Sequence, residues 1–249
     1  MATWIVHLRI AETLLETIPG LDAAAFAVGN IAPDSGMPDQ KWEKFTPPTE
    51  VTHFKNAESA AYDLADLVFH RQYLADLPPG TDAARYSFLL GYFCHIVTDN
   101  LWYMWIGEPT QKRFKANFEA DKDFIWEVKK DWYGLDFEYV RQHPESLYWR
   151  VFMDCDYPVN YLDFLLPVGV QQRIEHIKTY YQRDDEHSRE VINRERVYLT
   201  QTQVDQFVSG AAALLEYWYG NQALTDNAHS ASSILEIIDP RQFCEMDIQ

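Results

Sequence analysis

The stretch AARYSFLLGYFCHIVTDNLWYMWI, residues 83–106, decides the fold predicted for this chain of 249 residues. It is apolar almost all round a helix and approaches the length needed to cross a bilayer. His95 and Asp99 lie in its middle, where hydrocarbon would penalise them heavily. We therefore expect a buried central helix around which the rest of the chain packs.

Helical periodicity also dominates the sequence on both sides of this stretch. Pro19-Gly20 is expected to end the first helix, Pro109 to end the central one, and Thr202 with Asp205 to cap the last. The segment 31–38 (IAPDSGMP) is expected to be an irregular loop, and alternating strand patterns are essentially absent. The expected helices cover residues 8–18, 23–28, 59–73, 83–106, 110–134, 136–142, 145–153, 161–166, 168–195 and 204–218. The sequence thus predicts an all-α protein, a single multi-helix domain spanning 1–249.

Composition narrows the classes of function. The 38 acidic and 21 basic residues give a net charge of −17, which repels polyanions unless a local cationic site reverses the field. Nucleic acid is therefore an unlikely partner, and no transmembrane segment is expected. The cysteines (Cys94, Cys155, Cys244) are odd in number and widely spaced, as expected of buried thiols. The first residues lack the pattern of a signal peptide, which favours a cytoplasmic location.

The central helix carries a pair of metal-ligand residue types on one face. His95 and Asp99 are four residues apart, so their side chains project one turn apart and can converge on one ion. Gly91 lies one turn earlier and leaves room for another segment to approach. The alternative is that the buried histidine and aspartate simply hydrogen-bond to each other or to a neighbouring element.

Three upstream residues extend this pair. His7 lies on an apolar helix, Asp34 in the Pro/Gly loop, and His53 shortly after Pro47-Pro48. Imidazole nitrogens and carboxylate oxygens together suit zinc, and catalytic zinc sites keep a coordination position open for water. The sequence therefore predicts a metal site.

Four ordered blocks of sequence, in a segment of about residues 4–133, resemble the zinc-dependent phospholipase C family. The blocks are HLRIA at 7–11, GNIAPDS at 29–35, THF at 52–54 and GYFCHIVTDNLW at 91–102. The resemblance implies an all-helical domain, with residues 134–249 completing it, and a cluster of one to three zinc ions that binds and activates a phosphodiester. The fungal single-strand-specific nucleases are distant relatives with the same cluster.

Position by position, the resemblance implies that Asp34, His53, His95 and Asp99 surround one zinc ion. It implies that His7 holds a second ion, with Asp99 bridging the two. Family members that are secreted also use an N-terminal tryptophan as a ligand, whereas Trp4 is an internal residue here. For a third ion, the resemblance implies Asp123 as a carboxylate ligand, while Glu119 stands where the family has histidine.

We expect the chain to hydrolyse a small phosphodiester or the headgroup ester of a phospholipid, by attack of metal-activated water on phosphorus. Asp34 is the preferred general base, although it could serve only as a ligand. The alternatives are a nuclease-like phosphodiesterase and a helical metal-binding protein without catalysis. Aromatic residues, among them Trp126, Trp132 and Tyr133, are expected in the core, with lining of a cleft as the alternative. His176 and His187 are expected on a solvated, charge-rich helix. The sequence leaves the oligomeric state open.

Overall fold

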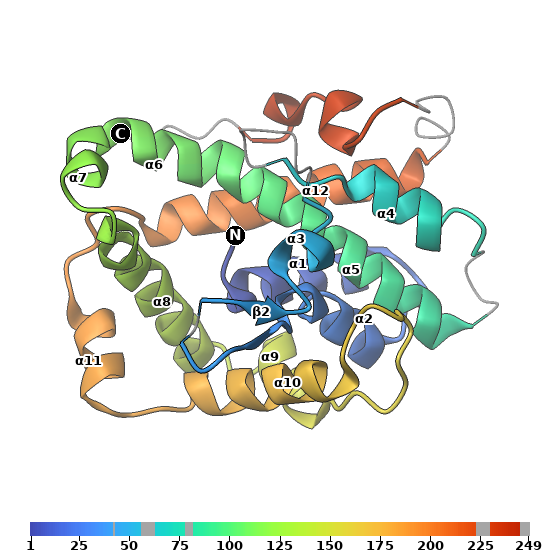
Figure 1. Cartoon of the computed structure of the whole chain (residues 1–249), viewed down its shortest axis with the longest axis horizontal. Helices are drawn as coiled ribbons and strands as arrows, with labels where there is room; N and C mark the ends of the chain where they lie inside the picture. Colours follow the sequence, from blue (N-terminus) through green and yellow to red (C-terminus); the bar gives the residue numbers. More distant parts are fainter. Residues whose placement is uncertain (42, 56–62, 78–81, 223–229, 245–249) are drawn as a thin grey trace.

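Helix α5 (Ala83–Trp102) forms the centre of the molecule, as the sequence predicts (Figure 1). The computed structural model describes residues 1–41, 43–55, 63–77, 82–222 and 230–244. Every residue of α5 from Tyr86 to Trp102 is buried, because neighbouring helices cover all of its sides. Its start is capped by Asp82, whose side chain accepts a hydrogen bond from the backbone N–H of Arg85.

The regular secondary structure of the described residues is otherwise almost wholly helical, which confirms the all-α fold class. The remaining α-helices are α1 (Trp4–Thr17), α2 (Ala23–Gly29), α3 (Thr49–Thr52), α4 (Asp66–Tyr73), α6 (Glu108–Arg113), α7 (Lys115–Ala120), α8 (Phe124–Gln142), α9 (Leu147–Arg150), α10 (Pro167–Tyr181), α11 (Glu186–Asn193) and α12 (Gln201–Gly220). The short 3-10 helices are η1 (Ala32–Asp34), η3 (Phe152–Asp154), η4 (Ile234–Glu236) and η5 (Pro240–Gln242). The segment η2 (Tyr103–Gly107) is a π-helix. The strands β1 (Met37–Pro38) and β2 (Phe45–Thr46) form a small antiparallel pair.

Helix α2 packs closely against α5 because each contributes a glycine at the contact. A Cβ atom on Gly91 would lie 2.4 Å from the carbonyl oxygen of Phe26, and one on Gly29 would lie 2.1 Å from that of Phe88. Such distances leave no room for a side chain, so glycine is what allows the two backbones to meet. The expectation that Gly91 admits a neighbouring segment beside the His95–Asp99 face is therefore confirmed.

Several expected helix boundaries are wrong. Pro109 does not end the helical path: it occupies the first turn of α6, where its missing N–H costs nothing. Gly134 lies inside α8 rather than at its end, because α11 approaches so closely that a Cβ would lie 2.2 Å from the carbonyl oxygen of Val191. The last helix is capped by Thr200 with Gln203, not by Thr202 with Asp205.

Other differences concern whole segments. Residues 161–166 are not helical, residues 168–195 are divided between α10 and α11, and the 31–38 loop contains the η1 turn. The expected helix 59–73 is described only from residue 63 and is helical from Asp66, so its start lies outside the described residues. Cys94 and Cys155 are buried as expected, but Cys244 is only partly buried. Among the described residues, no helix is long and apolar enough to cross a membrane.

Candidate metal centre

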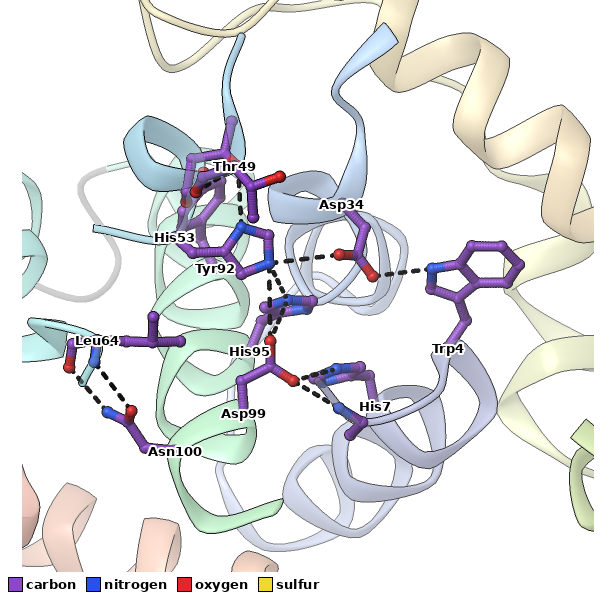
Figure 2. A network of polar contacts seen from close by, with 12 residues as sticks. Trp4, His7, Asp34, Thr49, His53, Leu64, Tyr92, His95, Asp99 and Asn100 are labelled. Atoms are coloured by element: carbon purple, nitrogen blue, oxygen red, sulfur yellow. Dashed lines mark hydrogen bonds and ion pairs between the residues drawn. The ribbon is translucent and has the colours of Figure 1, made fainter. Parts of the chain in front are cut away.

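Five side chains predicted from the sequence meet in the interior between α1, η1, α3 and α5 (Figure 2). His7 comes from α1, Asp34 from η1 and His53 from the residue that follows α3, while His95 and Asp99 come from α5. His7, His95 and Asp99 are fully buried, His53 is 1% exposed, and the side chain of Asp34 is 10% exposed. When several carboxylates and imidazoles are buried this close together, their charges must be compensated by one another or by a metal ion.

Donor atoms of Asp34, His95 and Asp99 lie around His53 Nε2 at distances close to those between ligands of a tetrahedral site. His53 Nε2 lies 3.3 Å from Asp34 Oδ1, 3.3 Å from His95 Nε2 and 3.6 Å from Asp99 Oδ2. His95 Nε2 lies 3.5 Å from Asp99 Oδ2. Ligands bound tetrahedrally to zinc at about 2.0–2.1 Å are separated from one another by about 3.3–3.4 Å. The donor set and its spacing therefore fit one zinc ion.

The hydrogen bonds on the far side of the two imidazoles direct their Nε2 lone pairs at one another. His95 Nδ1 lies 2.8 Å from the carbonyl oxygen of Asn30, which only accepts, so Nδ1 carries the proton. His53 Nδ1 lies 2.9 Å from Thr52 Oγ1, whose own hydrogen points to the carbonyl of Thr49. This network leaves both Nε2 atoms unprotonated in the neutral rings, as metal-bound imidazoles require.

His7 and the second oxygen of Asp99 form an adjoining pair. His7 Nε2 lies 3.4 Å from Asp99 Oδ1, and its ring stacks on that of His95 with centroids 3.9 Å apart. Both ring nitrogens of His7 are buried without a hydrogen-bond partner. Asp99 Oδ1 also accepts the backbone N–H of Ala2 at 2.7 Å. His7, His95 and Asp99 form one group of suitable ligand atoms, and Asp34, His53 and His95 form another, each within 4.8 Å.

Electrostatics favour the ligand-ready states of His7 and Asp34, whereas the surroundings of His95 favour its protonated form in the absence of a metal ion. Burial lowers the pKa of His7 to about 4, so its imidazole is neutral at neutral pH. Burial opposes the charge on Asp34, but its hydrogen bond to His53 and the charge on His95 hold the pKa of Asp34 well below its ordinary value. For His95, burial is outweighed by the charge of Asp99, which raises the pKa. Neutral imidazole and ionised carboxylate are the forms that bind zinc.

A cavity of about 320 Å³ opens beside the cluster, and Asp34 is the cluster residue that lines it. The indole Nε1 of Trp4 donates to Asp34 Oδ2 at 2.9 Å and holds this carboxylate at the cavity wall (Figure 2). Trp4, Trp126, Trp132 and Tyr133 line the same cavity. Trp132 is also 5% exposed and part of the core, whereas Trp126 is 59% exposed. The expectation of a core position is therefore confirmed for Trp132 and wrong for Trp126, and the alternative of a lined cleft applies to Trp126, Trp132 and Tyr133.

The structure does not bring Asp123 to this cluster. Asp123 is an exposed residue at the start of α8, and it belongs to neither group of converging ligand atoms found among the described residues. It comes just before a helix that reaches the cavity farther along, through Lys129 and Tyr133. Sequence alignment alone could not show that Lys129 and Tyr133 of α8 face the cavity while Asp123 is exposed, because this depends on how α8 is rotated.

Sequence reasoning also missed residues that contact the site or its cavity. Thr52 and Asn30 orient the two histidines, and Lys129, Arg173 and His176 line the cavity. His176 is exposed, as expected of a solvated helix face, but its ring also lies edge-on to Trp4 with centroids 5.6 Å apart. A usable signal was present on α8, where Trp126, Lys129 and Tyr133 follow helical spacing and so share one face.

Comparison with known proteins agrees with the geometry. Residues 6–113 match the sequence model of a family described as zinc dependent phospholipase C. The matched segment contains all five converging residues and ends before Asp123. No curated protein and no solved structure matches the chain. The family resemblance carried by the four sequence blocks is thus confirmed.

Proposed function

Because residues 6–113 match the model of the zinc-dependent phospholipase C family, we propose that this chain is a zinc-dependent phosphodiester hydrolase. The observation that carries the proposal is the buried set of imidazole nitrogens and carboxylate oxygens within 3.3–3.6 Å of His53 Nε2, which meets a cavity through Asp34. A structural cluster of this kind would have no need of an adjoining cavity. A catalytic one requires access for substrate.

In this proposal Asp34, His53, His95 and Asp99 would hold one zinc ion. His7 and Asp99, whose Nε2 and Oδ1 atoms lie 3.4 Å apart, would hold a second. Zinc held there would supply a water of lowered pKa and a Lewis acid for the phosphoryl oxygens. Asp123 is left out of the ligand set because it lies apart from the other residues.

Asp34 is proposed as the residue that positions or deprotonates the attacking water. Its Oδ1 faces His53, and its Oδ2 is fixed by the Trp4 indole at the cavity wall. A carboxylate held at the boundary between ligands and cavity is placed to accept a proton from water on that side. The other proposed ligands are buried within the protein, and none of them lines the cavity.

The proposed substrate is a small phosphodiester or the phosphoryl headgroup of a phospholipid. The aromatic wall of Trp4, Trp126 and Trp132 supports a substrate with an apolar part, since rings beside a polar centre bind amphipathic groups well. The size of the cavity, about 320 Å³, suits a small group and not a folded nucleic acid.

The test combines metal analysis with a hydrolysis assay. Purified protein should contain tightly bound zinc and release nitrophenol from a chromogenic phosphodiester, and removal of zinc by a chelator should abolish the release until zinc returns. The double variant His95→Ala/Asp99→Ala should lose both properties. His143→Ala is the control, because His143 is exposed and paired with Glu145. Wild-type protein without bound zinc would refute the metal centre. Bound zinc without any hydrolysis would leave a non-catalytic metal protein.

A further inference from the structure

Two positively charged side chains reach the cavity beside the metal centre from separate helices. Lys129 comes from α8 and Arg173 from α10, and both line the cavity together with Asp34. Arg173 Nε is buried without a hydrogen-bond partner. Lys129 forms no ion pair or hydrogen bond in the part of the chain that the structure describes. Both cations therefore retain donors for a ligand.

Acidic residues outnumber basic ones by 38 to 21 in this chain, yet neither Lys129 nor Arg173 forms an ion pair with any residue that the structure describes. The next residue along α8 shows the contrast: Lys130 lies 3.1 Å from Glu127 and 3.4 Å from Glu190. Lys129 turns instead toward the cavity, where Asp34 is the acidic residue in the lining. Burial lowers the pKa of Lys129 and of Arg173, and the charge on Asp34 raises both, so each cation lies within electrostatic reach of the site.

The same two cations occupy the faces of the aromatic rings. Lys129 Nζ lies 4.9 Å from the ring centroid of Trp126 and 5.9 Å from that of Trp132. Arg173 Cζ lies 5.2 Å from the ring centroid of Trp4. A quaternary ammonium group binds proteins chiefly through such ring faces. In this cavity it would have to displace a protein cation from the ring while being repelled by that cation's charge.

We propose that Lys129 and Arg173 bind the phosphoryl oxygens of the substrate opposite Asp34, and that they select phosphodiesters whose headgroup carries no quaternary ammonium. This inference rests on the proposed function and names the substrate class of that site. Guanidinium and ammonium groups form short, charge-assisted hydrogen bonds to phosphate, and these are strengthened in a partly enclosed cavity. The two side chains and the metal centre would hold the phosphoryl group from different sides.

The first test measures binding of inorganic phosphate by the change in tryptophan fluorescence, because three tryptophans line the cavity. Lys129→Met and Arg173→Met should each weaken binding about tenfold or more, the usual cost of a hydrogen bond to a charged group. Lys130→Met and Arg183→Met are the controls: Lys130 is paired with Glu127, and Arg183 also lies over a ring, that of Tyr180, but outside the cavity. Controls should bind as wild type does.

Charge-retaining variants separate binding from folding. Lys129→Arg and Arg173→Lys should keep most of the affinity, so loss in the methionine variants alone identifies the charge as the cause. Phosphate affinity unchanged in both methionine variants would overturn the proposal. Phosphate binding that depends on both cations, in a protein without hydrolytic activity, would support the cation site and refute the proposed enzyme.

The second test compares two chromogenic substrates, p-nitrophenyl phosphorylcholine and p-nitrophenyl methyl phosphate. Wild-type protein should prefer the methyl ester in kcat/KM by about tenfold or more, as expected when a cation must enter beside unpaired cations. The preference should shrink in Lys129→Met and in Arg173→Met, and it should persist in Lys130→Met. A wild-type preference for the choline ester would contradict the selection of headgroups.

Discussion

The Nε2 atoms of His53 and His95 face each other at 3.3 Å, although the residues are 42 positions apart in the chain. Their Nδ1 atoms are engaged by Thr52 and by the carbonyl of Asn30, so each ring is held in one orientation. Two imidazole lone pairs at this distance repel unless a cation lies between them, and the ring orientation itself therefore favours an ion.

Thr52→Val should weaken zinc binding about tenfold, within the range found when a hydrogen bond behind a metal-bound histidine is removed. Valine keeps the shape of the side chain and leaves the Thr52 carbonyl, which accepts the hydroxyl of Tyr92, in place. Zinc affinity would be measured by competition with a chelating dye. Unaltered affinity would mean that Thr52 does not set the tautomer of His53.

Trp4→Phe should reduce kcat about tenfold while zinc content and KM change little, since the loss of one oriented hydrogen bond costs on the order of 1 kcal/mol. Phenylalanine retains a ring at the cavity wall but lacks the N–H that donates to Asp34 Oδ2. Steady-state hydrolysis with parallel metal analysis distinguishes the two effects. An equal loss of zinc would instead assign Trp4 a role in metal binding.

Gly91→Ala should destabilise the protein by about 1–3 kcal/mol, the usual cost of inserting a methyl group into a packed contact. The new Cβ would lie 2.4 Å from the carbonyl oxygen of Phe26 and 3.0 Å from the backbone nitrogen of Asn30. Because the carbonyl of Asn30 orients His95, zinc affinity should fall as well. Gly220→Ala is the matched control, since a Cβ there meets nothing within 4 Å. Unfolding in urea measures both variants, and equal stabilities would contradict the close packing of α2 on α5.

Asp66→Asn should change the pH dependence of stability. Burial raises the pKa of Asp66 from 3.8 to about 7, although Ser233, Ile234 and Asn100 donate hydrogen bonds to its carboxylate. The folded state therefore binds more protons than the unfolded state between these two pH values. The free energy of unfolding of the wild type should fall as pH rises through this window, by on the order of 1 kcal/mol per unit of pKa shift.

Asparagine at this position cannot ionise, so the variant should gain stability relative to the wild type between about pH 5 and about pH 8. Urea unfolding at both pH values provides the measurement. Asp154→Asn, at an exposed aspartate, controls for the loss of a carboxylate. A difference between variant and wild type that does not change with pH would show that the hydrogen bonds to Asp66 offset its burial.

The sequence determined the helical class, the central helix and the half-site of His95 and Asp99. These features are local: helical periodicity and a spacing of four residues fix which side chains share a face, whatever the rest of the chain does. Ordered sequence blocks added His7, Asp34 and His53, because a family resemblance carries over residues that spacing alone cannot connect. The segment that matches the family model ends at residue 113, and Asp123 lies beyond it.

Only the tertiary structure decided how these residues meet and what surrounds them. The orientation of His53 toward His95, the exposed place of Asp123, and the approach of Lys129 and Arg173 to one cavity all depend on the rotation and docking of separate helices. Docking is set by contacts between segments that are distant in the sequence. Examples are the glycine contacts between α2 and α5 and the contact of Gly134 with α11. Such contacts leave little trace in local periodicity. The candidate metal ligands were therefore readable from the sequence, while the cavity and its charges were not.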